Sequence, residues 1–171
     1  MDNTYDPELI LKEADTFILC YEALIRAQSK YVVTEPNKAI SITRAANVNH
    51  AFAFELYLKC LLCIEGKEIP EHHELTKLFA LLNAVTKNTI VSEFDKGPGY
   101  YNTVLLEMHL LGFASKKIEF IGLLRQTPKA FSSLRYKYEK GRKVQNYELD
   151  KSIKYVRATI LKLKPELIGY L

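Results

Sequence analysis

Hydrophobic residues recur along much of this chain at the three- and four-residue spacings that place them on one face of an α-helix. One such stripe runs from about residue 7 to residue 29, and another from about residue 73 to residue 87. Further helices are expected over residues 103–113, 116–124, 128–131 and from about 148 to 165. With no internal repeat, the pattern predicts a single all-α domain over residues 1–171, an up-and-down bundle of five or six helices.

The most hydrophobic stretch, residues 51–64, belongs to a long helix expected from about Asn37 to Glu65. At fourteen residues it is shorter than the roughly 20 that a membrane span requires. A helix that is apolar on nearly all sides is surrounded by other helices, so this is predicted to be the central helix of the bundle. Its two charged residues, Glu55 and Lys59, lie one helical turn apart.

Proline, glycine and capping residues mark the expected helix boundaries. Asp6 and Pro7 are typical of a helix start, and Gly66 is expected to close the central helix in a left-handed conformation. Gly97-Pro98-Gly99 predicts a loop over residues 93–101, and residues 135–147 form a polar, basic connector.

Composition favours one compact domain, because 171 residues with 48% hydrophobic content can bury a substantial core. The three cysteines, Cys20, Cys60 and Cys63, are odd in number and lie in apolar helical segments. They are expected to be small core residues without disulfides, which favours a reducing compartment. Because the N-terminus lacks the basic and apolar regions of a signal peptide, a cytoplasmic location without membrane attachment is expected.

Charge is distributed unevenly. Residues 1–124 hold 12 Lys and Arg against 16 Asp and Glu, whereas residues 125–171 hold 12 against 4. The basic part includes a segment with five cations and two tyrosines in nine residues, a composition suited to phosphate contact and base stacking. Its members are Arg135, Tyr136, Lys137, Tyr138, Glu139, Lys140, Arg142 and Lys143. Alternatively, its first residues fold inward and the later cations form a solvated turn.

The order of three motifs resembles the HEPN superfamily, small helical domains of prokaryotic defence and toxin–antitoxin systems. The motifs are the Glu55-x-x-x-Lys59 helix, a helix start at His73-Glu74-Leu75, and the segment from Phe131 to Glu139. The resemblance implies a helical bundle that forms a homodimer. In catalytic members, an Arg and a His separated by four to six residues cleave RNA without a metal, the His moving protons and the Arg stabilising phosphate charge.

This chain departs from that catalytic pattern. Its only Arg with a suitably spaced His is Arg44, followed by His50, and this pair precedes the Glu55 motif. Six residues correspond to about 600° of helical rotation, so the two side chains would lie about 120° apart around one helix. At the family's usual place the chain has Arg135 with no following histidine. Arg135, Arg44 and His50 are therefore the candidate catalytic residues, and absence of the RNase activity is the alternative.

Glu55 and Lys59 are spaced for an ion pair along the helix. One interpretation is a structural cluster that links the central helix to His73, to Arg135 and to the Tyr136, Tyr138 and Glu139 segment. The other is a groove for an anionic ligand, with Lys59 and Arg135 as its cations. No metal site is predicted at His72-His73, the Cys60-x-x-Cys63 pair is expected in the core, and no cofactor is predicted.

Three functions are compatible with these observations. The first is a HEPN-like binding or regulatory module, dimeric, that engages RNA or a nucleotide in defence or stress response. The second is a metal-independent endoribonuclease of a toxin–antitoxin system, with an antitoxin as partner. The third is an accessory subunit of a nucleotidyltransferase.

Overall fold

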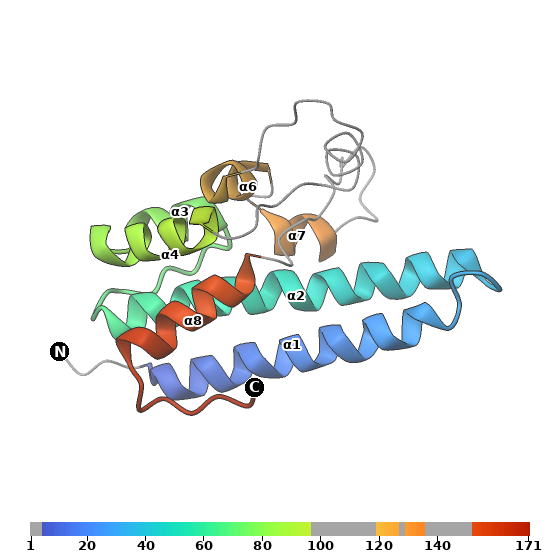
Figure 1. Cartoon of the computed structure of the whole chain (residues 1–171), viewed down its shortest axis with the longest axis horizontal. Helices are drawn as coiled ribbons and strands as arrows, with labels where there is room; N and C mark the ends of the chain where they lie inside the picture. Colours follow the sequence, from blue (N-terminus) through green and yellow to red (C-terminus); the bar gives the residue numbers. More distant parts are fainter. Residues whose placement is uncertain (1–4, 97–118, 127–128, 136–151) are drawn as a thin grey trace.

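The computed structural model describes residues 5–96, 119–126, 129–135 and 152–171 (Figure 1). Helices account for the regular structure of these residues, with no strand among them, so the predicted all-α helical bundle is confirmed. The expected helix over residues 103–113, the Gly97-Pro98-Gly99 loop and the basic residues from Tyr136 to Lys143 lie outside the described residues.

Two long antiparallel helices, α1 (Pro7–Ser29) and α2 (Pro36–Ile64), form the base of the molecule. The Asp6 carboxylate accepts a hydrogen bond from the backbone amide of Glu8 at 2.9 Å, and Pro7 occupies the first turn, as predicted. Gly66, at φ 68°, closes α2, and its amide donates to the carbonyl of Cys63 at 3.0 Å.

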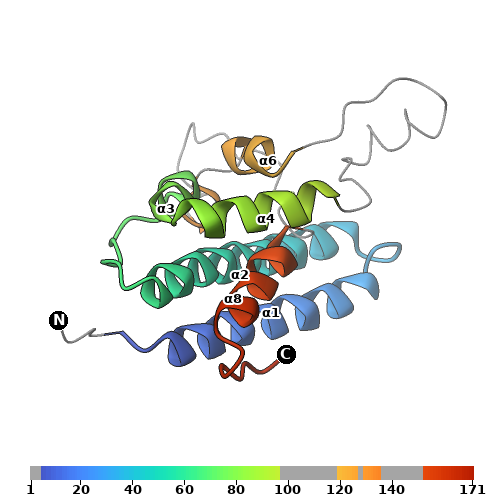
Figure 2. The same cartoon turned by 60° about the vertical axis from the view of Figure 1, so that its left-hand side comes forward.

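The second half of α2 is the centre of the core, which confirms the prediction for this helix. Its buried side chains include Phe54, Tyr57, Leu58, Leu61 and Leu62. They are covered by α1 on one side and by shorter helices on the other (Figures 1 and 2). At about 25 cal/mol per Å² of buried apolar area, each such side chain contributes roughly 2 kcal/mol to folding.

The single helix predicted from His73 to Lys87 is wrong, because the structure has two helices there. These are α3 (Leu75–Leu81) and α4 (Ala84–Lys96), so Glu93 to Lys96 are helical and do not form the predicted loop. The break is held by the carboxylate of Glu65, which accepts hydrogen bonds from the Asn83 amide at 2.8 Å and the Thr86 hydroxyl at 2.5 Å. A carboxylate 18 residues away thus caps the start of α4.

Three more helices complete the described structure: α6 (Phe120–Gln126), α7 (Ala130–Arg135) and α8 (Ile153–Leu163). The predicted boundaries need three corrections. The helix expected over residues 116–124 runs from Phe120 to Gln126, with Glu119 outside it. The short helix expected over residues 128–131 continues to Arg135, and the last helix ends at Leu163, two residues before Pro165. The side chains of Phe120, Leu123, Val156 and Ile160 are buried against α2, α3 and α4 as part of one continuous core.

Beyond α8, residues 164–171 turn back across the bundle and reach α1; we call them the C-terminal segment (Figures 1 and 2). Leu167 packs against the core, whereas Ile168 and Tyr170 are exposed. The segment therefore brings the end of the described chain next to its first helix, and a backbone hydrogen bond described below joins them.

The cysteines differ from the prediction at one position. Cys60 and Cys63 are buried as expected, and their thiols donate to the carbonyl oxygens of Pro7 and Tyr5, each at 3.3 Å. Cys20 is exposed, so its assignment to the core is wrong. All three are free thiols, and burial raises the pKa of Cys60 to about 12, which makes it a poor nucleophile near neutral pH. Among the described helices, none is both long and apolar enough to cross a membrane.

Candidate functional site

The structure brings together three residues that the sequence singled out: Glu55 and Lys59 of α2, and His73 from the link before α3. Oε1 of Glu55 lies 2.9 Å from Nζ of Lys59 and 2.8 Å from Nδ1 of His73. The Glu55 side chain is completely buried, the Lys59 side chain is 15% exposed, and His73 is about half exposed. We call these three residues the Glu55 cluster.

The Glu55 cluster is not fully bonded. Oε2 of Glu55 is buried and has no hydrogen-bond partner among the residues that the structure describes. A buried carboxylate oxygen without a donor costs roughly 1 to 3 kcal/mol relative to a bonded one. The cluster therefore retains an unused acceptor beside Lys59 and His73.

Lys59 also lines a hollow of about 380 Å³ between α1, α2 and the link that precedes α3. Apolar side chains form most of its wall, and Lys59 and Glu71 are its charged members. Its lining residues are Tyr5, Ile10, Leu56, Lys59, Ile69, Pro70 and Glu71. An apolar wall with one or two charged groups is the usual composition of a small-molecule site.

The structure does not place the side chains of the other predicted members of this cluster. Arg135 is the last residue of α7, a helix that packs on α2: Phe131 of α7 stacks on Phe52 at 4.6 Å and lies 5.6 Å from the His73 ring. The position of the Arg135 side chain, and the residues Tyr136, Lys137, Tyr138, Glu139, Lys140, Arg142 and Lys143, lie outside the described part. Participation of Arg135 in the cluster stays a prediction.

The candidate pair Arg44 and His50 does not form a common site within one chain. Arg44 is exposed, whereas His50 is 2% exposed and packs against the ring of Tyr21 at 4.6 Å. This separation agrees with the predicted 120° between them. Burial lowers the pKa of His50 to about 4, so its imidazole is neutral near pH 7.

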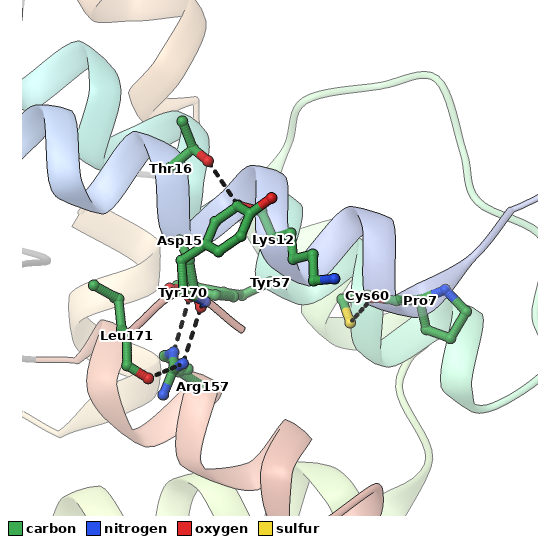
Figure 3. A network of polar contacts seen from close by, with 9 residues as sticks. All are labelled: Pro7, Lys12, Asp15, Thr16, Tyr57, Cys60, Arg157, Tyr170 and Leu171. Atoms are coloured by element: carbon green, nitrogen blue, oxygen red, sulfur yellow. Dashed lines mark hydrogen bonds and ion pairs between the residues drawn. The ribbon is translucent and has the colours of Figure 1, made fainter. Parts of the chain in front are cut away.

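A second polar cluster, which the sequence reasoning missed, surrounds Asp15 of α1 (Figure 3). Its carboxylate is completely buried and accepts from the Tyr57 hydroxyl at 2.5 Å and from Nε of Arg157 at 2.8 Å, both through Oδ1. Oδ2 accepts from Nη2 of Arg157 at 2.9 Å and from the backbone amide of Tyr170 at 2.8 Å. We call Asp15, Tyr57, Arg157 and Tyr170 the Asp15 cluster; it joins α1, α2, α8 and the C-terminal segment.

The pKa values in the Asp15 cluster follow from burial and from these bonds. Burial alone would raise the pKa of Asp15, but hydrogen bonds from Arg157 and Tyr57 and the charge of Arg157 outweigh it and hold the pKa below its ordinary value. Burial, followed by the hydrogen bond to Asp15, raises the pKa of Tyr57 well above its usual range. The hydrogen bond to Asp15 raises the pKa of Arg157. The cluster thus holds one stable ion pair at neutral pH.

Gly169 allows the C-terminal segment to approach this ion pair. A Cβ at this position would lie 2.0 Å from Oδ2 of Asp15 and 2.8 Å from Nη2 of Arg157. Nη2 of Arg157 also donates to the carbonyl oxygen of Leu171 at 2.9 Å. Two backbone hydrogen bonds therefore hold the segment against the ion pair, and the lack of a side chain at Gly169 leaves room for this contact.

The sequence carried a signal for the Asp15 cluster. Asp15 lies four residues after Leu11 and three before Ile18, and Arg157 lies four after Ile153 and three before Ile160. Each is thus a charged residue on the buried stripe of its own helix, a position that requires a partner. Two such residues of opposite charge in one chain are candidates to pair with each other.

No group of three or more His, Cys, Asp or Glu side chains among the described residues is arranged to hold a metal ion. No protein-family model, curated protein or solved structure matches this chain.

Proposed function

We propose that this protein is a helical binding module whose ligand carries a phosphate group, a nucleotide or the backbone of an RNA, and that it binds beside Lys59. The observation that carries the proposal is the position of Lys59, whose ammonium group pairs with buried Glu55 and whose side chain lines the 380 Å³ hollow. The apolar wall would hold the body of the ligand, and Lys59 would contact its phosphate.

The contacts of Glu55 support this role. Glu55 holds Lys59 and His73 through one oxygen, so both groups are oriented before a ligand arrives. Arg135, the last residue of the neighbouring helix α7, stays a predicted second cation of this site.

A binding role is favoured over RNA cleavage by the state of His50. A general acid or base needs a pKa near the working pH and contact with the substrate. His50 is buried and its pKa is about 4, while Arg44 is on an exposed part of the helix. Neither condition is met by this pair.

Calorimetric titration with AMP, and gel retention of a mixed RNA in EDTA, would test the proposal. Glu55→Gln keeps the Lys59 cation but loses the carboxylate that orients it, so the two effects oppose each other and binding should stay within about threefold of the wild type. Glu55→Gln/Lys59→Met removes both charges and should weaken binding at least tenfold. Lys162→Met, at an exposed position on α8, is the matched control and should bind like the wild type.

The outcomes separate the alternatives. Binding that is equal in the wild type and in Glu55→Gln/Lys59→Met would contradict the assignment of the site. RNA cleavage that is lost in Arg135→Ala or His50→Ala would replace the binding role with the endoribonuclease. RNA retention that is lost only in Lys140→Ala/Arg142→Ala/Lys143→Ala would move the nucleic-acid contact to the basic segment.

The resemblance to the HEPN superfamily adds a homodimer and a role in defence or stress response to this proposal. The α1–α2 hairpin supports self-association, since Val32, Val33 and Ile40 near its turn are exposed, Val33 at 89%. Analytical ultracentrifugation at micromolar concentration should show a dimer, and Val33→Lys should shift it toward monomer. A strictly monomeric wild type would contradict the dimer.

A further inference from the structure

A second hollow, of about 240 Å³, lies on the opposite side of α2 from Glu55, between α1, α2 and α8. Its size suits a ligand smaller than a typical drug. Its lining residues include Ile18, Tyr21, His50, Lys154, Arg157 and Leu171. It shares no lining residue with the hollow beside Lys59.

The inner wall of this hollow is aromatic and uncharged. The rings of Tyr21 and His50 pack at 4.6 Å with an interplanar angle of 58°, and His50 is neutral near pH 7 because it is buried. Tyr57 adds a third ring, with its hydroxyl directed to Asp15. Tilted aromatic rings in contact offer a surface against which another flat ring can pack.

The outer end of the hollow carries cations. Arg157 and the exposed Lys154 come from α8, and the one acidic lining residue, Glu22, is paired with Arg26 at 3.6 Å. Nη2 of Arg157 donates to the carbonyl oxygen of Leu171. The C-terminal segment thus places a backbone oxygen of Leu171 on Arg157, at a position that a carboxylate oxygen of a ligand could also take.

The end of the C-terminal segment is attached to the Asp15 cluster by two polar contacts. Its polar attachment to the cluster consists of the Tyr170 amide on Asp15 and the Leu171 carbonyl on Arg157. Hydrogen bonds to charged groups contribute about 1.5 to 3 kcal/mol each, so exchange of the single Leu171 contact for a ligand contact is accessible without global unfolding, which costs roughly 5 to 15 kcal/mol.

We propose that this hollow is a binding site for a small aromatic carboxylate and that the C-terminal segment is its competitor. The ring lies against Tyr21 and His50, and the carboxylate takes the place of the Leu171 backbone oxygen on Arg157, assisted by Lys154. Binding of the ligand therefore releases the end of the C-terminal segment, and seating of the segment lowers affinity for the ligand. This site is separate from the proposed site at Lys59.

Ligand-observed NMR titration with benzoate tests the proposal, with benzamide as the uncharged ligand of the same shape. Benzoate should bind saturably and at least fivefold more tightly than benzamide. Lys154→Ala should weaken benzoate binding about three- to tenfold, and Glu22→Gln should strengthen it about twofold. Both substitutions are at exposed positions, so the fold should be retained.

Gly169→Ala tests the competition. The new Cβ would meet Asp15, so the segment should leave its seat and benzoate should bind about three- to tenfold more tightly. Gly122→Ala in α6, where nothing lies within 4 Å of the new Cβ, is the matched control and should not change benzoate affinity. Glu55→Gln/Lys59→Met should also leave it unchanged, which separates this test from that of the Lys59 site.

Saturable benzoate binding that is weakened by Lys154→Ala and strengthened by Gly169→Ala supports the site and its competitor. Three results would overturn the proposal: absence of saturable binding, equal affinity for benzamide, or benzoate affinity that neither Lys154→Ala nor Gly169→Ala changes.

Discussion

Two buried carboxylates on opposite sides of α2 are bonded in different ways. Asp15 receives four hydrogen bonds, two on each oxygen, from α2, α8 and the C-terminal segment. Glu55 holds both of its partners through a single oxygen, and its other oxygen has no partner among the described residues. Residues 55 and 57 are about 200° apart around α2. Glu55 therefore faces Lys59 and His73, whereas Tyr57 faces Asp15 on the other side of the helix.

From this difference we expect Asp15 to stabilise the fold and Glu55 to belong to a ligand-binding site. A fully bonded buried ion pair makes its elements depend on one another, because removal of one partner leaves a buried charge. Glu55 has fewer bonds, and its partners Lys59 and His73 reach solvent, so its loss should cost less, and the Lys59 ammonium remains available to an anionic ligand. Substitutions on the two sides of α2 should therefore differ in both stability and binding.

Asp15→Asn should produce the largest effect, a loss of about 3 to 5 kcal/mol in the free energy of unfolding, because it leaves the mostly buried Arg157 guanidinium without its counter-charge. Urea denaturation followed by circular dichroism measures the loss. Glu13→Gln, at an exposed position on the same helix, is the control and should stay within about 0.5 kcal/mol of the wild type.

The stabilisation by Asp15 should also depend on pH. Because the pKa of the folded protein is below the ordinary value of 3.8, the contribution is complete above about pH 4 and is lost as the pH falls through the folded value. The gap between wild type and Asp15→Asn should therefore narrow below pH 4. A gap that is constant from pH 7 to pH 2 would contradict this account of the ion pair.

His50, on the Asp15 side of α2, should produce the second largest effect. Its pKa is about 4 when folded and 6.5 when exposed, so the unfolded chain binds its proton first as the pH falls. The free energy of unfolding should decrease by about 3 kcal/mol between pH 7 and pH 4 from this residue. His50→Phe should remove that dependence, whereas His72→Gln should keep it; an unchanged slope in His50→Phe would mean that another group is responsible.

Glu55→Gln should cost less than Asp15→Asn, about 1 to 2 kcal/mol, because Lys59 and the half-exposed His73 can turn to solvent when the carboxylate is lost. Glu55→Gln/Lys59→Met should recover most of that loss, since it removes the pair together. Parallel urea denaturation of both variants measures this. A loss equal to that of Asp15→Asn would remove the distinction between the two carboxylates.

The smallest effects are expected at two glycines. Gly169→Ala should cost about 1 to 2 kcal/mol, because the new methyl group separates the C-terminal segment from Asp15 and breaks backbone hydrogen bonds. Gly122→Ala should stabilise the protein by about 0.5 to 1 kcal/mol, because alanine favours the helix and has space there. Thermal denaturation would show opposite shifts in Tm; a shift of the same sign and size would contradict the close approach at Gly169.

The Glu55 cluster was largely predictable, because its central contact is local. Glu55 and Lys59 are one turn apart on a helix whose apolar pattern is unambiguous, and a buried pair of this kind needs further partners, of which His73 is one. The Asp15 cluster was not predicted, although Asp15 and Arg157 each interrupt a buried stripe. Its bonds join residues 42, 142 and 155 positions apart, and periodicity does not say which helices meet.

The sequence by itself determined the all-α class, the start of α1 at Pro7, the extent of α2 and its closure at Gly66, because these depend on side-chain spacing, capping and backbone conformation within a few residues. Only the tertiary structure decided the break between α3 and α4, the exposure of Cys20 and the seat of the C-terminal segment on Asp15. Each of these depends on a neighbour distant along the chain: Glu65 caps α4, the packing of α1 leaves Cys20 in solvent, and α8 brings Arg157 to Asp15.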